Sequence, residues 1–204
     1  MEQEMISQEK QKEVTDIAEI GDITKMKTKL IESTGIMTDL SPAVVVVYHG
    51  DKNPIYEFGK LDTGKGLKEL AQMGDPNKLQ NSLKLLPNVK EVHVAGNIQI
   101  DPGQKASASF EMNKGDKLAY VVMFGVSNDW FYSNKEVIDS KVEGDLISKT
   151  TLLDLGTGID QYPGAGNNQV LFGGFSQRES KNISKVGNIY PIPAMQNVLK
   201  INIE

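Results

Sequence analysis

The 204-residue chain contains no cysteine and only two histidines, His49 and His93. The lack of cysteine excludes disulfides, thiolate metal sites and a cysteine nucleophile, and two isolated histidines are too few for a histidine metal cluster. Both histidines lie on predicted strands, and the chain has no G-x-S-x-G motif of the kind that carries a catalytic serine. We therefore do not expect an enzyme that depends on cysteine or histidine.

Long apolar runs and a basic surplus are also missing. The longest apolar run extends only from Ala43 to Tyr48, whereas a membrane-spanning helix needs about 20 such residues. The formal charge is 22 − 27 = −5, which lacks the positive footprint of a nucleic-acid binder. No apolar segment followed by small residues marks a signal peptide. The sequence predicts neither a transmembrane segment nor a nucleic-acid partner.

The first 20 residues differ in composition from the rest of the chain. They are rich in Glu, Gln and Lys, have no aromatic residue, and show no apolar periodicity. Such a segment buries little surface. We expect residues 1–20 to form a tether or a loosely docked helix, and residues 21–204 to form one domain.

From Gly21 onward the main periodicity is two, which is typical of strands. Met26, Thr28 and Leu30 alternate with Lys25, Lys27 and Lys29; this predicts an edge strand with its lysines toward water. The β-branched run from Pro42 to Gly50 predicts a central strand. Residues 106–112 and 118–126 predict two strands joined by a hairpin loop at Asn113 to Asp116. Alternating Leu199, Ile201 and Ile203 predict the last strand.

One helix is expected in the middle of the chain. Asp75 is a suitable N-cap, Pro76 suits the first helical position, and leucines recur at helical spacing, so a short helix over residues 76–86 is predicted. A single helical turn around Gly66 to Met73 can precede it. Many strands with one helical insertion favour a mostly β, antiparallel sandwich, because parallel sheets need a helix between nearly every pair of strands.

The segment LLDLGTGID, Leu152 to Asp160, imitates the loop that holds S-adenosylmethionine in Rossmann-like methyltransferases. That loop is followed directly by a helix, which Tyr162, Pro163 and Gly164 disfavour here. A methyltransferase is therefore the least favoured of the functions considered.

Carboxylates at predicted strand ends are the most informative group. Asp129 directly follows the predicted strand 118–126, Asp154 follows Leu152 and Leu153 in a Gly-rich turn, and Asp160 lies in the same loop. Calcium takes six to eight oxygen ligands, and Gly-rich loops let backbone carbonyls turn toward the ion. The alternative is that these residues serve only local turn chemistry.

The segments GVSNDWFYS and LLDLGTGIDQYPGAGNNQ, in order with SPAVVVVYHG, GLKELAQMGDPNKL and NVLKINI, resemble the spondin N-terminal domain family. The resemblance covers roughly residues 25–204. It implies an eight-stranded antiparallel β-sandwich, a jelly roll similar to calcium-dependent lipid-binding modules, with a calcium ion in loops at one end. Asp129 and Asp154 match the family's ligands. A third acidic position falls on Gly158, and Asp160 is the residue that can substitute for it.

The resemblance further implies a non-catalytic, exported Ca²⁺-binding module that mediates adhesion or matrix interactions. Its ligand would be a protein or a glycan, and its location secreted or at the cell surface. The alternative is a structural subunit of a surface assembly or filament that self-associates through the N-terminal segment.

Overall fold

The computed structural model describes residues 25–33, 38–125, 127–164, 169–170, 178–188 and 190–204. The predicted tether at residues 1–20 lies outside these residues. Within the described part, neither α-helix has the length and apolar character needed to cross a bilayer.

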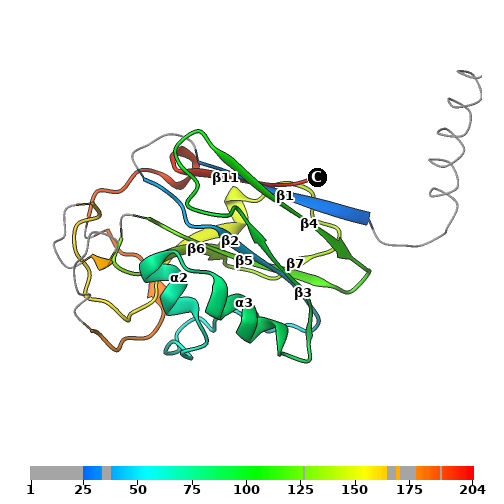
Figure 1. Cartoon of the computed structure of the whole chain (residues 1–204), viewed down its shortest axis with the longest axis horizontal. Helices are drawn as coiled ribbons and strands as arrows, with labels where there is room; N and C mark the ends of the chain where they lie inside the picture. The colour runs from blue at the N-terminus through cyan, green and yellow to red at the C-terminus, as the bar shows by residue number, and fades with distance from the viewer. Residues whose placement is uncertain (1–24, 34–37, 126, 165–168, 171–177, 189) are drawn as a thin grey trace, which may run out of the picture.

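Two antiparallel sheets form the fold, as the strand periodicity predicted (Figure 1). The four-stranded sheet has the order β4 (Lys105–Met112), β1 (Lys25–Ser33), β11 (Leu199–Ile203), β8 (Gly144–Asp145). The seven-stranded sheet has the order β10 (Ser184–Lys185), β9 (Thr150–Asp154), β6 (Trp130–Asn134), β5 (Lys117–Met123), β2 (Ala43–Tyr48), β3 (Val89–Ala95), with β7 (Ile138–Asp139) also paired to β5. Eight of the described strands have five or more residues, which agrees with the eight-stranded sandwich that was expected.

The strand β2 is central and fully buried, as predicted. Val45 and Val47 belong to the core between the two sheets. Val44 and Val46 belong to a second core on the other face of the seven-stranded sheet. A strand that is buried on both faces needs apolar residues at every position rather than at alternate ones, which explains the continuous valine run.

Helices α2 (Leu67–Met73) and α3 (Asn77–Lys84) cover the outer face of the seven-stranded sheet (Figure 1). The sequence predicted one helix over residues 76–86 and at most one turn before it, so the full helix α2 corrects that prediction. Helix α3 begins at Asn77 with Pro76 at its N-cap, one residue later than predicted, although Asp75 Oδ1 still accepts the backbone N–H of Asn77 at 2.9 Å. Gly74, in the left-handed conformation, ends α2 and separates the two helices.

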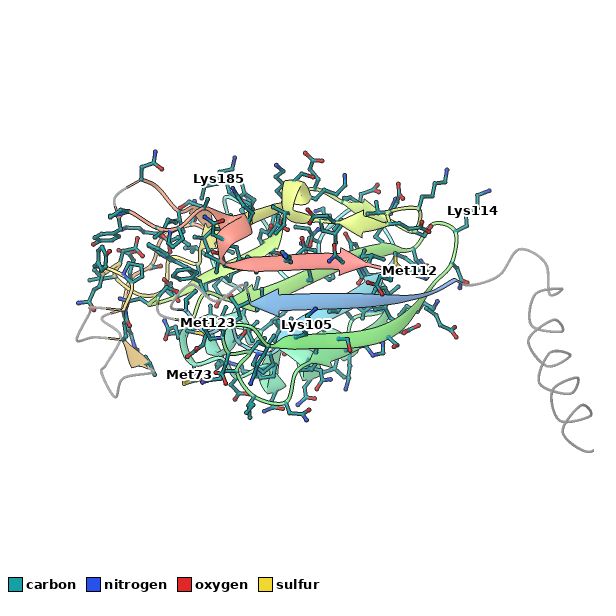
Figure 2. All side chains as sticks on the ribbon, turned by 90° about the horizontal axis from the view of Figure 1, so that it is seen from above. Met73, Lys105, Met112, Lys114, Met123 and Lys185 are labelled. Carbon is teal, nitrogen blue, oxygen red and sulfur yellow. The ribbon has the colours of Figure 1, made fainter. Side chains whose placement is uncertain are left out.

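The prediction that residues 25–30 form an edge strand is wrong. Strand β1 lies between β4 and β11 in the middle of the four-stranded sheet, where Figure 2 shows the three strands side by side. A period of two predicts a strand but does not say whether that strand lies at the edge or in the middle of its sheet.

The predicted hairpin at Asn113 to Asp116 is a connection between the two sheets. The turn itself is present, since the N–H of Asp116 donates to the carbonyl of Asn113 at 3.0 Å. It joins β4 to β5, which belong to different sheets, and Lys114 marks this end of the sandwich in Figure 2. Turn residues fix a local reversal of the chain but not the partner of the next strand.

Candidate metal centre

Asp129 and Asp154 lie together at one end of the sandwich, the end opposite Lys114. Asp129 directly precedes β6 and Asp154 ends β9, and these two strands are antiparallel neighbours with Trp130 opposite Asp154. Asp160 comes from the loop that follows β9. The three carboxylates each offer an oxygen within 4.8 Å of the others. The structure therefore brings together all three residues that the sequence singled out.

The loop after β9 is folded around the carboxylate of Asp129. Asp129 Oδ2 accepts hydrogen bonds from the N–H and Oγ1 of Thr157, at 2.7 and 2.9 Å, and from the N–H of Gly158 at 2.9 Å. Asp154 Oδ1 accepts the N–H of Gly156 at 2.7 Å. Each of these two aspartates thus uses one oxygen to fix the loop, which leaves the other oxygen for a further ligand.

Gly156 is required by its surroundings as well as by its conformation. Its φ is +72°, in the left-handed region, and a Cβ at this position would lie 2.5 Å from the carbonyl oxygen of Lys181. Its own carbonyl accepts the N–H of Lys181 at 2.9 Å. The loop therefore passes directly against the segment around residue 181.

Asp160 is fixed by a side chain of the core. The indole nitrogen of Trp130 donates to Asp160 Oδ1 at 2.6 Å. In addition, the side-chain amide nitrogen of Asn128 donates to the carbonyl of Ile159. These two bonds hold residues 159–160 against Asn128 and Trp130 at the start of β6. The position of the Asp160 carboxylate is therefore fixed by contacts outside its own loop.

Glu179 also belongs to this site, although the sequence gave no reason to choose it. Its N–H donates to the carbonyl of Thr157 at 3.1 Å, and the neighbouring residue Arg178 forms a β-bridge with Gly158. Its Oε2 lies 2.6 Å from the ammonium of Lys181. Its charge raises the pKa of Asp154 and of Asp160, so a fourth acidic group lies near the site through a tertiary pairing about 20 residues downstream of Gly158.

Several oxygens at this site are buried without a partner among the described residues. They are Asp129 Oδ1, Asn128 Oδ1 and Glu179 Oε1. An unpaired buried polar atom costs roughly 1–3 kcal/mol, and native proteins contain few of them. A hard cation coordinated by Asp129 Oδ1 and by the carboxylates of Asp154 and Asp160 would satisfy the unpaired oxygen of Asp129, so this donor set fits a cation.

The electrostatics also favour a cation. Burial, and then the neighbouring charge of Asp154, raise the pKa of Asp129 to about 7, although three hydrogen bonds oppose this rise. Burial raises the pKa of Asp154 to about 6, with a further contribution from Asp160 and Glu179. Burial likewise raises the pKa of Asp160. Acidic groups this close repel one another when ionised, and a divalent ion would remove that repulsion.

No family model matches the chain, and no curated protein matches it significantly.

Proposed function

We propose that this chain is a non-catalytic β-sandwich module that binds one calcium ion between the loops at one end of the sandwich. The observation that carries this proposal is the group of Asp129, Asp154 and Asp160, in which the fully buried Asp129 keeps an unpartnered Oδ1. Glu179 and Asn128 add two further unpaired oxygens from separate segments. Together these residues would hold the ion, which supplies positive charge.

Calcium is favoured over other metals by the chemistry of the donors. Every candidate ligand is an oxygen, whereas zinc and copper sites usually include histidine or cysteine. The ligands come from irregular loops, which suit the variable six-to-eight coordination of calcium better than the strict octahedron of magnesium.

Two neighbouring carboxylates with raised pKa values are also found in glycoside hydrolases. Here Asp129 has no exposed surface, Asp154 is buried and Asp160 is partly buried. A substrate could not reach the Asp129 carboxylate without displacing Thr157 and Gly158. This arrangement supports a structural ion rather than acid–base catalysis.

The setting of the module follows from the resemblance to the spondin N-terminal domain family. We propose that the protein acts outside the cell or at its surface, where it binds a protein or glycan during adhesion or matrix assembly. The ion would fix the loops at one end and so stabilise the surface that the sandwich presents. The two-sheet fold and the position of the three aspartates support this proposal.

Thermal unfolding in EDTA, calcium or magnesium tests the metal site. A ligand that binds only the folded state stabilises it by RT ln(1 + [L]/Kd), about 2.7 kcal/mol at a hundredfold excess over Kd. We expect calcium to raise the melting temperature of the unmodified protein and magnesium to raise it much less. Asp129→Asn and Asp154→Asn should lose this response, whereas Asp51→Asn, at an exposed position beyond β2, should keep it. A calcium response that is absent, or equal in all variants, would contradict the proposal.

A further inference from the structure

A second candidate site extends along strands β6 and β9, from Asn134, at the end of β6 away from the metal centre, to Leu153, the residue before Asp154. Two adjoining cavities, of about 320 and 280 Å³, share Tyr56 and Phe58 in their walls, and Tyr48 lines the larger one. Asn134, the last residue of β6, also lines the larger cavity. The volumes approach the lower end of the usual range for small-molecule sites, about 300–1,000 Å³.

The loop that carries the aromatic residues is held in place. The N–H of Ile55 donates to Asn53 Oδ1 at 2.9 Å, and the N–H of Gly59 donates to the carbonyl of Ile183 at 3.0 Å. The hydroxyl of Tyr56 donates to the carbonyl of Asn134 at 3.0 Å. The ring of Tyr56 also packs edge-on against the ring of Phe131, with centroids 5.5 Å apart. The aromatic wall is therefore preorganised, which lowers the cost of binding.

Phe58 is 57% exposed on this fixed loop. Large aromatic side chains are usually buried, and an aromatic side chain exposed beside a cavity offers an apolar surface that a ligand can cover. Leu61, three residues further on, is similarly exposed at 52% but lines neither of these cavities. Leu61 is therefore a matched control for the role of Phe58 in binding.

Charged side chains around the two cavities balance. Three lysines and three acidic residues line them: Lys52, Lys135, Lys185, Asp51, Glu57, Glu136. Their formal charges cancel, so the lining does not favour a strongly charged ligand. It offers many donors and acceptors to a neutral one.

We propose that these cavities bind a neutral oligosaccharide. A pyranose ring has an apolar C–H face that can lie on Phe58, and its hydroxyl groups both donate and accept hydrogen bonds, as the mixed charged rim requires. An oligosaccharide would be the ligand of the surface module. This inference rests on the proposed function only for the location of the protein at the cell surface. None of the three aspartates of the metal centre lines either cavity, so we do not expect binding to require the metal ion.

Isothermal titration calorimetry with cellohexaose, maltohexaose and chitohexaose tests the inference on the full chain. We expect at least one of these to bind, in EDTA as well as in calcium. Phe58→Ala should weaken binding about tenfold or more, the scale of an aromatic anchor residue. Leu61→Ala and Asp129→Asn should leave the affinity unchanged.

Three results would overturn this inference. One is the absence of binding by all three sugars at about 10 mM, an affinity too weak for a specific site. Another is binding that Phe58→Ala does not alter although the variant remains folded by circular dichroism. The third is binding of a proline-rich peptide in place of the sugars, since such peptides also dock in aromatic grooves. None of these outcomes would bear on the calcium melt, so the two proposals fail separately.

Discussion

The indole nitrogen of Trp130 lies 2.6 Å from Asp160 Oδ1, so the single tryptophan of the chain donates a hydrogen bond to a carboxylate of the candidate metal centre. Trp130 is itself part of the core between the sheets and is only 2% exposed. This bond connects the packing of the sandwich to the acidic loop, and it gives the site a spectroscopic reporter.

Calcium should therefore change the fluorescence of Trp130. We expect a saturable change during a calcium titration, because coordination of Asp160 withdraws electron density from the oxygen that the indole contacts. Asp160→Asn keeps an oxygen that can accept the indole hydrogen bond but removes one charge, and should raise the Kd roughly tenfold. A spectrum that does not change up to millimolar calcium would contradict the proposed position of the ion.

Stability without metal should depend on pH. Burial raises the pKa of Asp129 to about 7 and that of Asp154 to about 6 in the folded state, against about 3.9 when unfolded. Between pH 4 and 7 the folded state thus holds more protons, so the free energy of unfolding falls as pH rises. In EDTA, the melting temperature should be roughly 5 °C or more lower at pH 7.5 than at pH 5.

Calcium and Asp129→Asn serve as the controls for this pH dependence. Saturating calcium should reverse or flatten the trend, since the ion binds the ionised carboxylates. Asp129→Asn should flatten it in EDTA, because the residue with the largest shift no longer titrates. A melting temperature that rises between pH 5 and 7.5 in EDTA would show that these carboxylates are ionised at little cost.

Glu179 and Lys181 should affect calcium affinity in opposite directions. Glu179 has one oxygen without a partner, and its charge acts on Asp154 and Asp160. The Lys181 ammonium is bonded to Glu179 and acts on the same aspartates with the opposite sign. We expect Glu179→Gln to raise the Kd for calcium several-fold and Lys181→Gln to lower it, as measured by fluorescence titration. Changes of the same sign would show that these residues affect folding and not the ion.

Gly156→Ala should destabilise the protein more than Gly64→Ala. Both glycines have nearly the same left-handed φ, +72° and +71°, so both substitutions carry the strain of that conformation, about 1–3 kcal/mol. Only at Gly156 would the new Cβ meet backbone, 2.5 Å from the Lys181 oxygen, while Gly64 has open space around it. Chemical denaturation should show at least about 1 kcal/mol of additional loss for Gly156→Ala. Equal losses would mean that residue 181 moves away freely.

Deletion of residues 1–20 tests the assembly alternative. Their sparse, unperiodic apolar residues predict little contribution to the core, so the melting temperature should change by only a few degrees. Sedimentation of the full chain and the deleted chain over a range of concentrations should give the same mass. A fall of ten degrees or more in the melting temperature, or the loss of an oligomer on deletion, would favour the hypothesis of a structural subunit.

Sequence patterns predicted the parts of the fold that depend on local chemistry. The valine run of β2, the alternation of β11 and the Asp75 hydrogen bond at the start of α3 each follow from residues within a few positions of one another. The patterns did not predict that β1 lies between two other strands of its sheet, nor that residues 113–116 join different sheets. Those features depend on partners far away in the chain, and a local period carries no information about them.

The same distinction applies to the metal centre. Asp129 and Asp154 were predictable because both follow apolar strand segments, where side chains at the same end of a sheet converge. Glu179 was not, because it reaches the site through the pairing of residues 178–181 with the loop at 156–158. No motif around Glu179 indicates that contact. Glu179 could have been found only by looking for acidic residues on segments that are able to pair with the loop at residues 156–158.

The pairing of Trp130 with Asp154 has a consequence for the order of folding. Two of the three aspartates are brought together by one antiparallel pair, β6 and β9, whose strands are only about 20 residues apart in sequence, so the loop that must close is short. Glu179 and the C-terminal strand β11 join later along the chain. We therefore expect the ion to be captured by a partly folded chain, before the four-stranded sheet is complete, and calcium to accelerate folding rather than only to slow unfolding.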